Sequence, residues 1–130
     1  MTRGELKQYQ AIVREIKGLT EEIRQLRAEA ARYRSPDGQP HSNYQADRTA
    51  ALVAAIADLG AELTSRQAEL IRQRKKIERW IYRLAPRERE IIRLYYLLGL
   101  PWGEVAEQTR YSIRQVLRIH NETLGELPAE

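Results

Sequence analysis

Several side chains near the C-terminus of the chain have the chemistry of base recognition. Arg114 and Arg118 lie four residues apart, with Gln115 and Asn121 in the same stretch. Arginine donates two hydrogen bonds to guanine in the major groove of DNA, and glutamine or asparagine can pair with adenine through two hydrogen bonds. A helix over residues 112–124 presents these side chains together. The residue types therefore predict a helix that reads double-stranded DNA.

The residues at the start of this helix complete the predicted contact set. Ser112 is a good N-cap, and the backbone amides at a helix start can hold a phosphate. Arg110 and Tyr111 fall in the preceding turn and are expected to contact the DNA backbone. Ile113 and Leu117 can touch thymine methyl groups. The predicted DNA-binding residues are Arg110, Tyr111, Ser112, Ile113, Arg114, Gln115, Leu117, Arg118 and Asn121.

A second helix is needed to position the reading helix. Val105 and Ala106 supply the inner face of a short helix after Pro101, and Val116 and Ile119 supply that of the last one. Small and apolar residues at these positions allow two helices to cross closely, as a helix-turn-helix requires. Before them, a helix ending at Gly99 is expected. We thus predict a helix-turn-helix domain over residues 85–130, with residues 125–130 frayed.

The first two thirds of the chain predict a long helical hairpin. Apolar residues recur at steps of three and four over about four heptads, as in a coiled coil: Tyr9, Ile12, Ile16, Leu19, Ile23, Leu26, Ala30 and Tyr33. Turn-forming residues at about 35–43 predict a loop, and a second helix follows over about 44–84. The expected fold is all-α: an antiparallel hairpin over 1–84, then the helix-turn-helix domain.

The sequence does not decide what packs against the apolar face of each hairpin helix. The heptads suit an intramolecular seam and a homodimer or higher homo-oligomer equally well. The second helix is longer than the first, so its end must be buried by the C-terminal domain or by a second subunit. His120 is expected at the surface, Trp102 as a packing residue, and one of Tyr95 and Tyr96 in the core.

Composition narrows the functional class. The net charge of +4 and the pI near 9.6 suit an anionic partner, although residues 85–130 are close to neutral. The basic run from Arg72 to Arg83 is either a solvated helix face or a contact with the DNA backbone. There is no cysteine, paired-histidine metal motif or glycine-rich phosphate loop. No enzymatic activity, catalytic residue, cofactor, metal or membrane segment is expected, and the cytoplasm is the expected location.

Three stretches resemble region 4 of bacterial sigma factors: LAPREREIIRLYY (84–96), GLPWGEVA (99–106) and YSIRQVLRIH (111–120). With the hairpin before them, they are similar to phage and prophage late-gene regulators of the ArpU/RinA type. The resemblance implies promoter-proximal DNA binding, with RNA polymerase as a further partner. It places Ile113, Arg114, Leu117 and Arg118 at base-facing positions. Two of these four are apolar where sigma factors usually carry charge or an amide.

Two other functions fit parts of the sequence. Small terminase subunits, which package DNA, also combine a helix-turn-helix with a helical oligomerisation element, and they predict a large ring. A protein-interaction module with a sigma-like domain would bind polymerase or a regulator with little DNA contact. The near-neutral C-terminal domain and the apolar Ile113 and Leu117 favour the interaction module.

Overall fold

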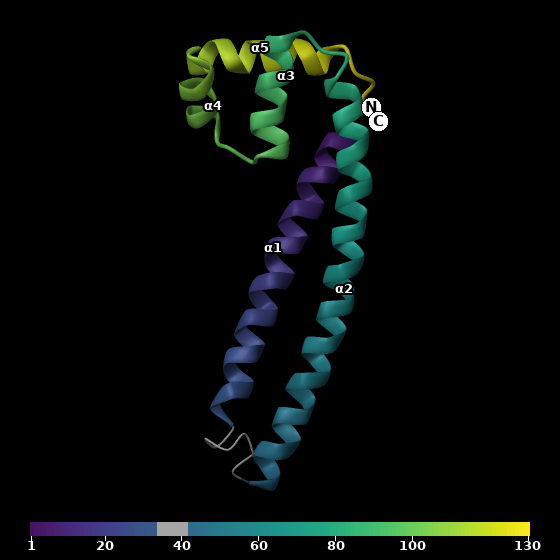
Figure 1. Cartoon of the computed structure of the whole chain (residues 1–130), viewed down its shortest axis with the longest axis vertical. Helices are drawn as coiled ribbons and strands as arrows, with labels where there is room; N and C mark the ends of the chain where they lie inside the picture. Colours follow the sequence, from purple (N-terminus) through teal and green to yellow (C-terminus); the bar gives the residue numbers. More distant parts are fainter. Residues whose placement is uncertain (34–41) are drawn as a thin grey trace. The chain divides into compact units, whose positions relative to one another are not determined.

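The chain is all-α in the computed structural model, which describes residues 1–33 and 42–130 (Figure 1). A long antiparallel hairpin of α1 and α2 is followed by a small three-helix unit, as the sequence predicted. The bounds are Arg3–Arg32 for α1, Asn43–Ile81 for α2, Pro86–Ile92 for α3, Arg93–Leu97 for its π-helical continuation η1, Trp102–Thr109 for α4 and Ile113–Gly125 for α5.

The ends of the hairpin helices differ slightly from the prediction. Most of the predicted loop at 35–43 lies outside the described residues, but Asn43 already belongs to α2. The hydroxyl of Ser42 accepts a hydrogen bond from the amide of Gln45 at 3.1 Å, which is a typical N-cap contact. Helix α2 ends at Ile81, three residues before the predicted end.

The described chain forms two compact units. We call Ile12–Glu69 the hairpin unit, and Met1–Ala11 together with Leu70–Glu130 the head unit. The head unit thus contains the first turns of α1, the last turns of α2 and all of the three-helix unit. Each is described below by itself.

The hairpin unit has a narrow apolar seam flanked by ion pairs. Ile12, Ile23, Ala30 and Leu52 are buried, while the other predicted seam residues of the unit are half-buried. Arg66, which interrupts the apolar pattern of α2, forms an ion pair with Glu15 at 2.9 Å. Both side chains are partly exposed, so at this position a surface ion pair stands in place of a buried apolar contact.

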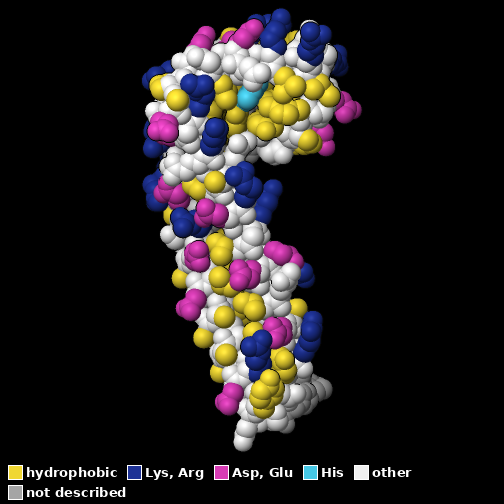
Figure 2. Space-filling view, turned by 180° about the vertical axis from the view of Figure 1, so that it is seen from behind, with side chains coloured by type: hydrophobic (Ala, Val, Ile, Leu, Met, Phe, Trp, Pro, Cys, Tyr) yellow, Lys and Arg dark blue, Asp and Glu magenta, His cyan; other side chains and the backbone are white. Residues whose placement is uncertain are grey.

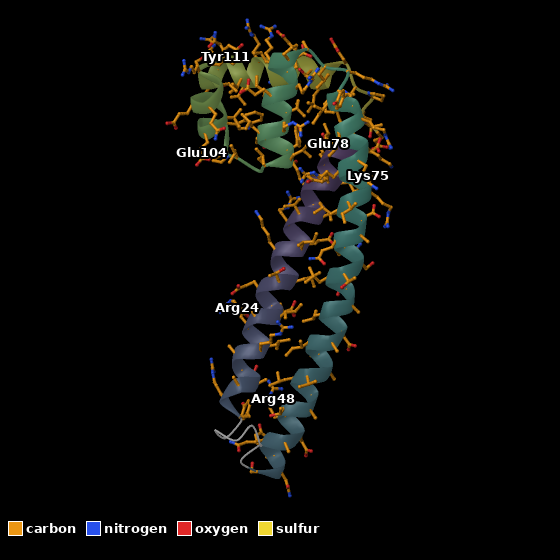
Figure 3. The ribbon with its side chains drawn as sticks, viewed as in Figure 1. Arg24, Arg48, Lys75, Glu78, Glu104 and Tyr111 are labelled. Carbon is orange, nitrogen blue, oxygen red and sulfur yellow. The ribbon has the colours of Figure 1, made fainter. Side chains whose placement is uncertain are left out.

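The end of α2 is covered within the head unit. Ile77 and Ile81 are fully buried there, as are Leu6 of α1 and Ile92 of α3. Glu78 lies on the side of α2 that faces α3 (Figure 3) and binds both guanidinium nitrogens of Arg93 at 2.9 Å. These hydrogen bonds hold the pKa of Glu78 below its usual range. The sequence left open whether the C-terminal domain or a second subunit lies against this end of α2. In the structure, residues of the C-terminal domain do so.

A compact core holds the three-helix unit together. Ile91 and Leu94 from α3 and η1 meet Val105 and Ala106 of α4, while Val116 and Ile119 come from α5. Gly99 has a positive φ of 69° and ends η1, as expected of a residue that follows a helix. In this core, α4 and α5 have the buried faces that the sequence predicted.

The C-terminal tail is bound rather than frayed. The amides of Arg3 and Gly4 donate hydrogen bonds to the carbonyls of Pro128 and Ala129 at 2.9 and 3.0 Å. The first amides of a helix lack partners within the helix, so they can bind another segment. The tail therefore satisfies donors at the start of α1, and the prediction of fraying was wrong.

Candidate nucleic-acid interface

A three-residue turn joins α4 to α5. Thr109 ends α4, and its hydroxyl donates to the carbonyl of Val105 at 2.8 Å. Arg110 then takes the left-handed conformation, with φ at 63°. Ser112 caps α5: its hydroxyl accepts from the amide of Gln115, while the side-chain oxygen of Gln115 accepts from the amide of Ser112. This capping box confirms the predicted start of the last helix.

One face of α5 is fixed in the core. Val116, Ile119 and Thr123 are buried, at a spacing of three, four and seven residues. The hydroxyl of Thr123 donates to the carbonyl of Ile119 at 2.8 Å, so its buried oxygen atom has a partner. Because this face is packed, the rotation of α5 about its axis is set, and the opposite face must point outward.

Seven of the nine predicted contact residues are exposed. Tyr111 and Leu117 are half-buried instead, and Tyr111 packs against the core (Figure 3). Ile113 keeps half of its surface exposed. The exposed members are Arg110, Ser112, Ile113, Arg114, Gln115, Arg118 and Asn121.

The charges of α4 and α5 differ in sign. The exposed residues of α4 include Glu104 and Glu107, and Glu104 is labelled in Figure 3. The turn and the first two turns of α5 carry Arg110, Arg114 and Arg118 instead. Although the domain as a whole is close to neutral, an anionic ligand is attracted to α5 rather than to α4.

An aromatic cluster supports α5 from the side of η1 and α4. The rings of Tyr95 and Trp102 stack at 3.8 Å between centroids, and Trp102 meets His120 edge-on at 4.7 Å. The Tyr96 hydroxyl lies 2.8 Å from Nε2 of His120. In Figure 2, apolar side chains gather around the histidine on this face. Trp102 packs as expected, but His120 is half-buried and hydrogen-bonded rather than a free surface residue.

Burial sets the protonation of this cluster. It lowers the pKa of His120 and raises that of the Tyr96 hydroxyl, because both charged forms lose contact with water. At neutral pH the imidazole is therefore neutral and the phenol keeps its proton. Sequence reasoning missed this cluster, since its members are up to 25 residues apart and no spacing rule links them.

The cations of the basic run near the end of α2 are exposed. Lys75, Arg79 and Arg83 repeat every fourth residue and are all exposed. Lys76 instead forms an ion pair with Glu5 at 3.4 Å. The run thus combines solvated cations with a side chain that binds α1, and both alternatives for its role stay open.

No cluster of three or more potential metal ligands occurs among residues 1–33 and 42–130. In the same ranges, no helix is both long and apolar enough to span a bilayer. Comparisons with protein-family models, curated proteins and solved structures gave no match to this chain.

Proposed function

We propose that this chain is a sequence-specific DNA-binding transcriptional regulator that reads the major groove with α5. The observation that carries the proposal is the division of α5 into two faces. Val116, Ile119 and Thr123 fix one face in the core, and Arg114 and Arg118 are exposed on the rest of the helix. A helix held in this way after a short turn can enter a major groove with its side chains already oriented.

The chemistry of the turn supports the same role. Arg110 adds a cation beside the capped start of α5, where free backbone amides favour a phosphate. Phosphate contacts of this kind position a protein on DNA, while side chains from the helix specify the sequence. The resemblance to sigma region 4 adds a promoter-proximal site and RNA polymerase as a second partner. We infer a phage or prophage origin from the same resemblance.

The experiment is selection of binding sites from a random pool of short duplexes, followed by affinity measurements over a series of salt concentrations. We expect one preferred sequence and an affinity that falls steeply with salt, because bound phosphates release counterions. Arg118→Ala should weaken binding to that sequence by about 1–3 kcal/mol, or about 5- to 150-fold. Arg27→Ala, an exposed arginine of the hairpin unit, is the matched control.

The outcomes separate the competing functions. Equal losses for Arg118→Ala and Arg27→Ala would contradict a reading role for α5. A large ring in size-exclusion chromatography with light scattering would favour the DNA-packaging alternative. Tyr44 and Val53 of α2 are exposed apolar residues, so a homodimer or larger homo-oligomer through the hairpin is part of the proposal.

A protein-interaction module is the second candidate, and one observation favours it. The half-buried rings of Tyr95 and Trp102 lie beside His120, where Figure 2 shows an apolar surface. Aromatic residues of this kind are enriched where proteins bind each other. A head that binds RNA polymerase but shows weak, salt-insensitive binding to every duplex would support this candidate over DNA reading.

A further inference from the structure

We propose that the exposed polar face of α5 is built to read hydrogen-bond acceptors, which makes guanine its preferred base in the major groove. This inference rests on the proposed DNA-reading function and specifies its target. From the sequence alone, Gln115 and Asn121 can pair with adenine through two hydrogen bonds. The contacts of their side chains in the structure favour guanine instead.

The arginines of the interface can only donate. A guanidinium group has five N–H donors and no acceptor. Arg110, Arg114 and Arg118 are all exposed. Their donors are therefore available to a ligand that presents acceptors.

The capping box also leaves Gln115 mainly as a hydrogen-bond donor. Its side-chain oxygen accepts from the amide of Ser112 at 2.9 Å. A bidentate contact with adenine needs this oxygen, because it must accept from the N6 amino group while the amide NH₂ donates to N7. An amide oxygen has two lone pairs, and the cap holds one of them, so two N–H donors and a single acceptor site of Gln115 remain for the base.

Asn121 is restricted through the aromatic cluster. Nδ1 of His120 lies 3.2 Å from the side-chain oxygen of Asn121, and Nε2 lies 2.8 Å from the Tyr96 hydroxyl. The side-chain oxygen of Asn121 can only accept, so the single N–H of the neutral imidazole is on Nδ1 and donates to it, while Nε2 accepts from the Tyr96 hydroxyl. Again one acceptor site of the amide oxygen is occupied, while both N–H donors of the NH₂ group are left free.

Five side chains along the turn and α5 thus present donors. Glu122 is an exposed acceptor on α5, but it lies beside Asn121 in the last turns, so the first turns, whose residues reach the bases, carry Arg114, Gln115 and Arg118. In the major groove guanine offers two adjacent acceptors, N7 and O6. Adenine places its N6 donor beside N7, thymine has one acceptor, and cytosine presents a donor. Guanine therefore best fits a face on which donors predominate.

The first test is the composition of the selected site. Wild-type protein and the random duplex pool should yield a site with guanines at the positions that α5 covers. A reproducible site with adenines at those positions would overturn this inference and leave the DNA-reading function intact. No binding to any duplex would overturn both.

The second test replaces the NH₂ donor of Gln115 and keeps the side-chain oxygen that accepts from the Ser112 amide. Gln115→Glu keeps a side-chain oxygen for the Ser112 amide, because glutamate also forms a capping box. It replaces the NH₂ donor by an acceptor, which can pair with the N4 amino group of cytosine. We expect about a tenfold loss of affinity for the guanine site and selection of cytosine at one position. Asn121→Asp makes the same exchange beside His120.

Gln108→Glu is the matched control, because Gln108 is exposed on α4 and the added charge is the same. It should weaken binding to all duplexes equally and leave the selected sequence unchanged. Thermal unfolding of the variants checks that the capping box is intact. If Gln115→Glu and Asn121→Asp both select the wild-type site, or behave like Gln108→Glu, the inference is wrong.

Discussion

His120 shows how a single residue connects the core to the interface. Its ring contacts Trp102, its Nε2 faces the Tyr96 hydroxyl, and its Nδ1 faces Asn121. The imidazole is half-buried among these groups, and its nearest polar partners are uncharged. A proton on this ring would lose solvation without gaining a counter-ion, which is why burial lowers the pKa of His120.

The lowered pKa predicts how stability depends on pH. The unfolded chain binds a proton at this histidine near pH 6.5, whereas the folded chain resists it. The free energy of unfolding should therefore fall as pH drops through the unfolded value, and level off below the folded pKa. Urea unfolding over a pH series measures this. His120→Gln should remove that part of the pH dependence.

The chain's other histidine provides the control. His41→Gln leaves the ring of His120 unchanged, so the pH dependence assigned to His120 should persist in this variant. If the two variants have the same pH profile as the wild type, the titration of His120 is not coupled to folding. If only His41→Gln flattens the profile, the assignment to His120 is wrong.

At the scale of the elements, the turn between α4 and α5 holds a local conflict. Arg110 is a non-glycine residue in the left-handed conformation, with φ at 63°. Side chains with a Cβ atom adopt this region at a cost, while glycine adopts it freely. Arg110 lies two residues before Ser112, the N-cap of α5, so the turn carries a cation at this position in spite of the backbone cost.

Arg110→Gly should therefore stabilise the fold and weaken DNA binding. We expect the free energy of unfolding to rise by about 0.5–1 kcal/mol, because the relief of backbone strain exceeds the entropy that glycine adds to the unfolded chain. Affinity for duplex DNA should fall, since one phosphate contact is lost. Arg110→Ala is the control that removes the guanidinium but keeps the Cβ atom. It should lower DNA affinity to the same extent without the gain in stability.

The elements with simple periodic signals could be predicted from the sequence. The heptads of α1, the apolar faces of α4 and α5 and the N-cap at Ser112 all follow from local spacing, and the structure contains them. The π-helical turn at Arg93–Leu97 was not predicted. It differs from an α-helix by one residue in the hydrogen-bond register, as between Leu98 and Arg93, and no residue type marks that change.

The candidate site was predictable by residue but not by orientation. Exposure of Arg114, Arg118 and Asn121 follows from the position of Val116 and Ile119 on the same helix. The occupied amide oxygens do not follow from it, because that of Asn121 depends on His120 and Tyr96, and Tyr96 lies 24 residues before His120. Contacts across such separations arise from tertiary packing, which spacing rules do not capture.

At the scale of the whole molecule, the head unit is assembled from both ends of the chain. Residues 1–11 pack with residues 70–130 in one compact unit, so the start of α1 and the end of α2 belong to the same unit as the three C-terminal helices. Carbonyl groups of the C-terminal tail accept hydrogen bonds from backbone amides at the start of α1. The amide of Glu5 binds the Thr2 hydroxyl at 3.0 Å, while the amide of Arg3 binds the carbonyl of Pro128 at 2.9 Å. The start of α1 is therefore capped partly by its own residue and partly by the tail.

Arg3→Pro tests the contribution of the tail. Proline is well tolerated at the first position of a helix, where Arg3 lies, but it lacks the amide that binds Pro128. Losing one backbone hydrogen bond should cost about 0.5–1.5 kcal/mol in the free energy of unfolding and speed amide exchange in residues 126–130. Arg3→Ala removes the same side chain and keeps the amide, so it should leave both properties close to wild type. Equal exchange rates in the two variants would mean that the tail is held by other contacts, and that the amide of Arg3 does not join the two ends of the chain.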